Sequence, residues 1–229
     1  MRDPRHGPLV AMLLVLTVVT GLVDALSYLA LGHVFVANMT GNVIFLGFAL
    51  AGAPGLSARA SLAALAAFLA GALAGGHLAR RRPAHRGRLL VLTVAVQSAL
   101  FAGCALLAAA FGHTAEPVRY TLIGVLGGAM GLQNAVVRAL KVPDLTTTVL
   151  TMTLTALAAD RAGPRRLASA AWMFAGALLG AVLVLHAAVP VALAAALALL
   201  LAVAALTHHA SGHPAAPWTH PDPGPDPGR

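Results

Sequence analysis

Eight long stretches of this chain carry almost no charged residues, which excludes an ordinary fold in water. They are continuous in Ala, Leu, Val and Gly and do not alternate with polar residues. Only 10% of all residues are charged, against roughly 25% in soluble domains. In a lipid bilayer only helices and closed barrels satisfy their own backbone hydrogen bonds, and unbroken apolar runs are typical of helices. The predicted fold class is therefore all-α, a polytopic transmembrane helix bundle.

Prolines, glycines and short polar loops separate the apolar segments. The segments cover residues 9–31, 34–52, 60–79, 89–111, 118–140, 145–159, 167–186 and 189–206. The first follows Arg2 and Arg5 as a secretory signal would, but it is longer than the ~7–15-residue core of such a signal. We therefore expect a retained helix there. Residues 208–229 are rich in His, Pro and Gly, and we expect this tail to be disordered.

The positions of lysine and arginine predict how the segments cross the membrane, because cytoplasmic loops hold the excess of these residues. Most of them lie in four clusters, in residues 2–5, 80–88, 138–141 and 161–166. All four clusters face one side if the second and sixth segments are broken or re-entrant and do not cross. The pattern thus predicts six crossings of a bacterial inner membrane, with residues 1–8 and the C-terminus in the cytoplasm.

The two halves of the chain resemble each other. Residues 21–25 (Gly-Leu-Val-Asp-Ala) match residues 131–135 (Gly-Leu-Gln-Asn-Ala), and residues 70–75 (Ala-Gly-Ala-Leu-Ala-Gly) match residues 175–180 (Ala-Gly-Ala-Leu-Leu-Gly). We therefore expect two membrane repeats, 9–111 and 112–207. Three crossings in each repeat would place the second upside down relative to the first. Inverted repeats with discontinuous helices are typical of many secondary transporters.

Asp24 is the one acidic or basic residue well inside an apolar segment. Inserting a charge there costs about 3 kcal/mol, so an intramembrane acid is a candidate for function. The alternative is a protonated carboxyl group bonded to Asn38, Asn42 or a hydroxyl, with a role in packing only. Asn134 is the repeat counterpart of Asp24. It is either part of a solute site or the donor of a hydrogen bond between helices.

Polar residues also mark the two exceptional segments. The second contains Asn38, Thr40 and Asn42, and Thr151 lies opposite Thr40 in the sixth. We expect helix breaks at Gly32 and Gly41, where unwound backbone would present N–H and C=O groups to a small polar solute or ion. These residues, with Asp24 and Asn134, form the candidate binding site. Helix packing or a plain loop are the alternatives.

Pairs of glycines four residues apart indicate close helix approach. They are Gly71 with Gly75, Gly124 with Gly128, and Gly176 with Gly180. Such faces pack helices within one bundle, and they would also suit a homodimer. The sequence leaves both open.

Other partners and activities are not indicated. The formal net charge of +8 arises in short loops, where membrane orientation explains it, so we expect the lipid bilayer and no nucleic acid as partner. The chain has no His-Glu-x-x-His, Gly-x-Ser-x-Gly or phosphate-binding Gly-Lys-Ser pattern. The histidines of the tail lack the spacing of metal ligands. We expect no enzymatic activity, no cofactor and no metal site.

Residues 21–28 (Gly-Leu-Val-Asp-Ala-Leu-Ser-Tyr) are followed by residues 37–42 (Ala-Asn-Met-Thr-Gly-Asn). This fixed order of polar residues resembles the signature of the YoaK family, small bacterial membrane proteins defined by a domain of unknown function. The resemblance spans roughly residues 9–207, and Met152 departs from it where a glycine would be expected. It implies about six helices in the cytoplasmic membrane and supplies no activity.

These observations favour a secondary transporter or permease for a small polar or ionic solute, with Asp24 as the binding or coupling carboxylate. The alternative is a non-transporting membrane scaffold or partner-binding subunit, in which the same polar groups only hold helices together.

Overall fold

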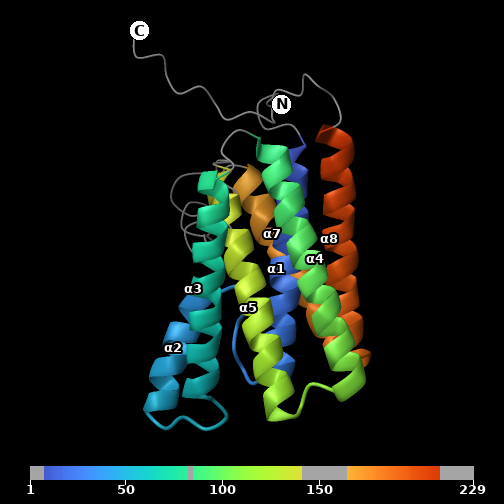
Figure 1. Ribbon diagram of the computed structural model, residues 1–229. Helices are drawn as coiled ribbons and strands as arrows, with labels where there is room; N and C mark the ends of the chain where they lie inside the picture. The colour runs from blue at the N-terminus through green and yellow to red at the C-terminus, as the bar shows by residue number, and fades with distance from the viewer. Residues whose placement is uncertain (1–7, 82–84, 141–163, 212–229) are drawn as a thin grey trace.

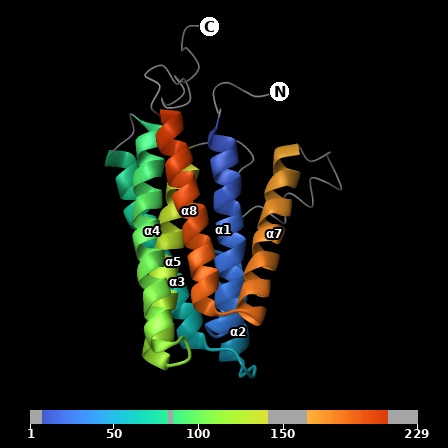
Figure 2. The same cartoon turned by 90° about the vertical axis from the view of Figure 1, so that its right-hand side faces the viewer.

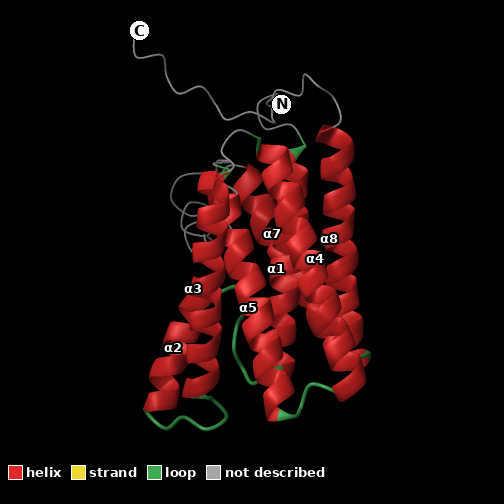
Figure 3. Cartoon of the chain, viewed as in Figure 1, coloured by secondary structure: helices red, strands yellow, loops and turns green. Residues whose placement is uncertain are grey.

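The computed structural model describes residues 8–81, 85–140 and 164–211, and within them it contains helices and no strand (Figures 1 and 3). The helices are α1 (Leu9–Ala30), α2 (Met39–Leu50), α3 (Ala58–Arg81), α4 (Arg86–Phe111), α5 (Glu116–Ala139), α7 (Pro164–His186) and α8 (Val189–Ser211). The predicted sixth segment, 145–159, lies outside the described residues. Most of the predicted tail also lies outside the described residues. Residues 208–211 belong to α8, so their assignment to a disordered tail was wrong.

Among the described residues, six helices are long and apolar enough to cross a membrane: α1, α3, α4, α5, α7 and α8. The exception is α2, whose 12 residues span only about 18 Å of a ~30 Å hydrocarbon core. The all-α polytopic bundle is therefore confirmed, with six candidate membrane spans among the described residues. The predicted second segment, 34–52, is helical only over α2.

The chain between α1 and α3 enters and leaves the bundle at one end. After α1 it turns back and runs alongside the bundle toward its middle, and α2 then returns to the end where α1 finished (Figure 1). Residues 31–57 thus form a re-entrant hairpin, as predicted. Because this hairpin adds no crossing, α5 runs opposite to α1, and the two halves are inverted.

A glycine-dependent cap makes the reversal after α1. The N–H of His33 donates to the carbonyl oxygen of Tyr28 at 3.2 Å, the bond that closes a Schellman motif. Gly32 lies between them with φ +101°, and His33 itself has φ +56°. A residue with a Cβ is disfavoured at the Gly32 backbone angle, which explains why the helix ends there.

The crossing helices pair between the halves. Helix α1 packs along α7, and its counterpart α5 packs along α3, while α4 and α8 pack on each other (Figure 2). In addition, α1 touches α8 and α5 touches α4. Each contact therefore has an equivalent in the other half, so the two halves interlock.

Matching residues form the two equivalent interfaces. A Cβ added to any of six glycines would clash with the facing helix, and the six clashes form three equivalent pairs. The clash of Gly71 with Gly128 corresponds to that of Gly176 with Val18, the clash of Gly75 with Leu132 to that of Gly180 with Leu22, and the clash of Gly131 with Phe68 to that of Gly21 with Met173. Every pair follows the spacing of the sequence repeat. The exception to the expected glycine contacts is Gly124, where an added Cβ would meet nothing within 4 Å.

The close approach predicts a contrast between two glycines of α5. Gly131→Ala would push a methyl group into the backbone of α3, and overpacking of this kind costs typically about 1–3 kcal/mol. Gly124→Ala fills open space and gains up to about 1 kcal/mol of helix propensity. Thermal unfolding in detergent should show a lower midpoint for Gly131→Ala alone. Equal midpoints would contradict the α3–α5 packing.

The topology predicts which loops share a side of the membrane. Ser57 and Thr114 lie in the α2–α3 and α4–α5 loops at one end, whereas His85 lies in the α3–α4 loop at the other. The native thiol of Cys104 is buried and is removed as Cys104→Ala. Single cysteines at Ser57 and Thr114 should react with an impermeant maleimide from the same side, and one at His85 from the opposite side. Because only α3 and α4 lie between Ser57 and Thr114, a mixed result would mean that one of these two helices does not cross.

Candidate functional site

The Asp24 side chain binds the unwound part of the re-entrant hairpin. Asp24 lies on α1, nearly two helical turns before its end, and is only 5% exposed. Its Oδ1 accepts hydrogen bonds from the backbone N–H groups of Val36 at 3.0 Å and Ala37 at 2.8 Å. Its partners are thus backbone amides, and not the side chains of Asn38 or Asn42 that the sequence suggested.

Asn42, on α2, also binds the unwound backbone of the hairpin. Its Oδ1 accepts from the N–H of Phe35 at 2.8 Å, and its Nδ2 donates to the carbonyl oxygen of Phe35. The Asn42 side chain is fully buried. Asp24 and Asn42 together bind three successive amides, those of residues 35, 36 and 37. Backbone amides in a bilayer interior are costly without partners, so these two side chains allow the hairpin to exist there.

An aromatic cluster packs against the hairpin. Tyr28 stacks on Phe35 with ring centroids 5.3 Å apart, and Phe45 lies 5.5 Å from Phe35 and 5.8 Å from Tyr28. A Cβ on Gly41 would approach the Phe35 ring to 2.6 Å. Gly41 therefore makes room for an aromatic ring inside α2, and the prediction of a helix break at Gly41 is wrong.

Of the other candidate residues, Asn38 approaches Asp24 through its backbone. Asn38 precedes α2 without a side-chain capping bond, and Thr40 is exposed. Asn134 lies on α5, where its Nδ2 donates to the carbonyl oxygen of Met130 at 2.9 Å. Thr151 lies outside the described residues. Of the residues proposed from the sequence, Asp24 and Asn42 bind the same stretch of hairpin backbone through their side chains.

A second polar group, which the sequence reasoning missed, joins three helices. Gln97 Nε2 of α4 donates to Gln133 Oε1 of α5 at 3.0 Å, and Gln133 Nε2 donates to Thr20 Oγ1 of α1 at 3.2 Å. All three side chains are buried. A lone glutamine in the middle of an apolar helix was the available signal for Gln97. Its partners could not be read from the sequence, because they lie on other helices.

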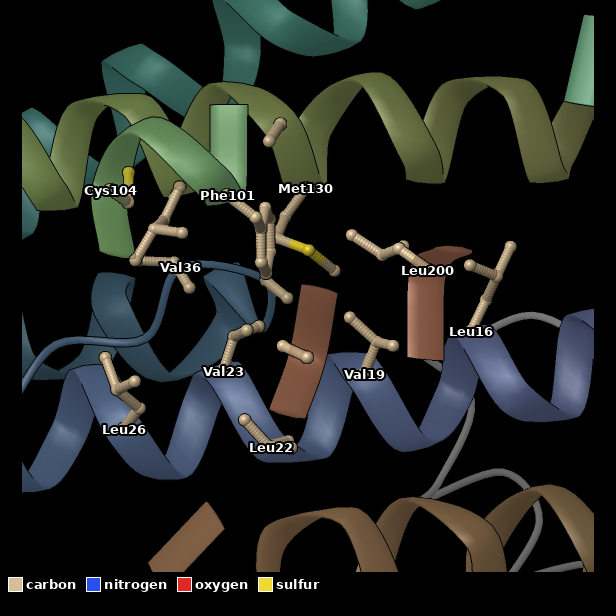
Figure 4. Close-up of a cluster of buried hydrophobic side chains, with 14 of the residues drawn as sticks. Leu16, Val19, Leu22, Val23, Leu26, Val36, Phe101, Cys104, Met130 and Leu200 are labelled. Atoms are coloured by element: carbon tan, nitrogen blue, oxygen red, sulfur yellow. The ribbon is translucent and has the colours of Figure 1, made fainter. Parts of the chain in front are cut away.

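Three buried oxygens have no hydrogen-bond partner among the described residues: Asp24 Oδ2, Gln97 Oε1 and Ser98 Oγ. Val36, Phe101 and Met130 lie in the hydrophobic cluster between α1, α4 and α5 (Figure 4). Buried polar atoms normally have partners, so these three oxygens mark places where a ligand could bind. The described residues contain no group of three His, Cys, Asp or Glu that could hold a metal ion.

The family described as "Protein of unknown function (DUF1275)" matches residues 12–206. The chain belongs to this family. It is also 32% identical over 157 residues to UPF0700 transmembrane protein YoaK of Bacillus subtilis (strain 168), across 66% of this chain and 67% of that protein. No solved structure matches the chain. The resemblance drawn from residues 21–42 is thus confirmed, and this DUF1275 member is a multi-pass membrane protein.

In this DUF1275 protein, the hairpin should depend on Asn42. Asn42→Ala leaves the buried N–H and C=O of Phe35 unpaired, and each such group costs about 1–3 kcal/mol. Val43→Ala is the matched control, because Val43 is 58% exposed on the same helix. Thermal unfolding in detergent should show a clear drop in midpoint for Asn42→Ala and little change for Val43→Ala. A similar small change for both would show that Asn42 does not hold the hairpin.

Proposed function

We propose that this protein is a secondary transporter or permease for a small polar or ionic solute, with Asp24 as its binding or coupling carboxylate. One observation carries the proposal: an inverted repeat contains a re-entrant hairpin whose unwound amides bind an intramembrane acid. In secondary transporters, discontinuous helices at the interface of such repeats supply the binding groups.

The arrangement supports coupling between ligand binding and conformation. The Asp24 carboxyl group binds the hairpin through Oδ1, while Oδ2 has no partner among the described residues. A ligand at Oδ2 changes the charge that the amides of Val36 and Ala37 experience. Hydrogen bonds to a charged group are roughly twice as strong as neutral ones. Ligand binding therefore alters how tightly the hairpin is held against α1.

The same proposal includes the orientation. We place the protein in a bacterial inner membrane with both termini in the cytoplasm. Arg81, Arg86 and Arg138 lie at the end of the bundle where α1 begins, and Arg59 and Arg119 lie at the other. The positive-inside rule makes the first end cytoplasmic. Asp24 then lies closer to the outer side. We propose no enzymatic activity and no nucleic acid partner.

The test is flux in proteoliposomes. Currents on a solid-supported membrane and stopped-flow light scattering would follow concentration jumps of alkali chlorides, ammonium chloride, sugars, amino acids and organic acids. Asp24→Asn keeps an oxygen for the two amides and removes the charge; Asn134 already occupies the equivalent position in the second half. We expect at least a tenfold loss of flux in Asp24→Asn, because the charged oxygen that contacts the solute is gone.

The control is Thr17→Val. Thr17 lies on α1, and its hydroxyl donates to the Leu13 carbonyl oxygen of its own helix. The Thr17→Val variant should therefore show the same flux as the wild type. Undiminished flux in Asp24→Asn would remove Asp24 from the mechanism. Absence of flux for every solute, with a stable partner in affinity purification, would favour a scaffold.

A further inference from the structure

The three unpartnered oxygens lie on or next to one run of buried polar side chains, a polar route. Thr20 and Asp24 are one helical turn apart and therefore share a face of α1. Thr20 accepts a hydrogen bond from Gln133, which accepts one from Gln97. Ser98 is the next residue of α4, and no hydrogen bond joins its side chain to this run among the described residues. The route begins at the hairpin of the first half and passes through α5 of the second. It thus crosses the interface at which the inverted halves meet.

The hydrogen bonds along the route run in one direction. Gln97 Nε2 donates to the Ala129 carbonyl oxygen and to Gln133, Gln133 Nε2 donates to Thr20, and the Thr20 hydroxyl donates to the Leu16 carbonyl oxygen. Both N–H groups of Gln97 and the hydroxyl of Thr20 are therefore occupied. The unpartnered atoms are a carboxylate oxygen, an amide oxygen and a hydroxyl oxygen, all of which can accept. A ligand with hydrogen-bond donors or a positive charge would therefore satisfy all three oxygens.

The nearest backbone amides do not offer an anion site. Unwound backbone and a helix N-terminus often bind anions, but here the N–H groups of Phe35, Val36 and Ala37 already donate to Asn42 and Asp24. An anion would also be repelled by the Asp24 carboxylate. The available groups therefore select against an acidic solute.

We propose that the ligand of this route is a small cation, either an alkali metal ion or a protonated primary amine, bound by Asp24 Oδ2, Gln97 Oε1 and Ser98 Oγ at successive positions. This inference rests on the proposed transport function and specifies its solute or coupling ion. The two hydrogen bonds from backbone N–H groups to Oδ1 and the positive end of the α2 dipole nearby partly offset the negative charge of Asp24. Binding is then weak enough for release, which conduction through successive sites requires.

The experiment measures cation-dependent stability of the full-length protein in detergent. Thermal unfolding is recorded in sodium, potassium, ammonium and methylammonium chloride, with choline chloride at equal ionic strength as reference. A ligand that binds only the folded state raises the midpoint. We expect at least one of the four small cations to raise it by about 3 °C or more over choline, the size of a modest binding free energy.

Three variants locate the effect. Asp24→Asn should abolish the cation shift, and Ser98→Ala should reduce it without lowering stability in choline, since Ser98 Oγ has no partner to lose among the described residues. Thr93→Val is the control, because Thr93 lies one turn before Gln97 on α4 and donates only to the Leu89 carbonyl oxygen of its own helix. Its shift should equal that of the wild type.

The outcomes separate this inference from transport itself. Equal midpoints in choline and all four small cations would overturn it, as would a shift that persists in both Asp24→Asn and Ser98→Ala. If a neutral or acidic solute shows Asp24-dependent flux and no small cation raises the unfolding midpoint, the cation site is rejected and the transport function is retained. A cation shift lost in Asp24→Asn, without flux of any solute, would support the cation site and reject transport.

Discussion

A backbone amide inside a bilayer has no water to bond, so a chain that unwinds there needs protein partners for each amide. Here Asn42 and Asp24 provide them for three successive residues, Phe35, Val36 and Ala37. These bonds let α2 return to the end where α1 finished. If α2 crossed instead, the first half would contain four crossings, and α5 would run parallel to α1. The inversion of the two halves therefore depends on two polar side chains.

Small residues carry the packing that follows from this inversion. Lipid is as apolar as leucine, so helices in a bilayer associate through close van der Waals contact. Gly71 and Gly131 bring α3 against α5, and Gly176 and Gly21 bring α7 against α1. Because each first helix packs on the third helix of the other half, neither half contains its own main interface. The large apolar side chains of α3 and α7, including Leu73 and Phe174, instead face outward.

The sequence was informative wherever one residue or one spacing was enough. The absence of charge predicted a bundle of membrane helices, the arginine clusters predicted the hairpin and six crossings, and Asp24 stood out as the lone acid in a span. It was uninformative where two distant residues had to be paired. That Asn42 binds Phe35, that Gly41 accommodates its ring, and that Gln97 meets Gln133 all depend on how helices approach one another. Gly124 shows the same limit, since its spacing matched a contact that the packing does not make.

The interlocked halves are equivalent in backbone and different in chemistry at their centre. Asp24 corresponds to Asn134, Gln133 to Val23, and Thr20 to Met130. In an inverted repeat the two halves could exchange their arrangements with little change in the free energy of backbone packing, because each interface has an equivalent in the other half. Any preference for one state must then come from groups that break the symmetry. Here these groups are the acid on α1 and the glutamines on α4 and α5, so under the proposed transport function a ligand at Asp24 would act on one of the groups that break the symmetry.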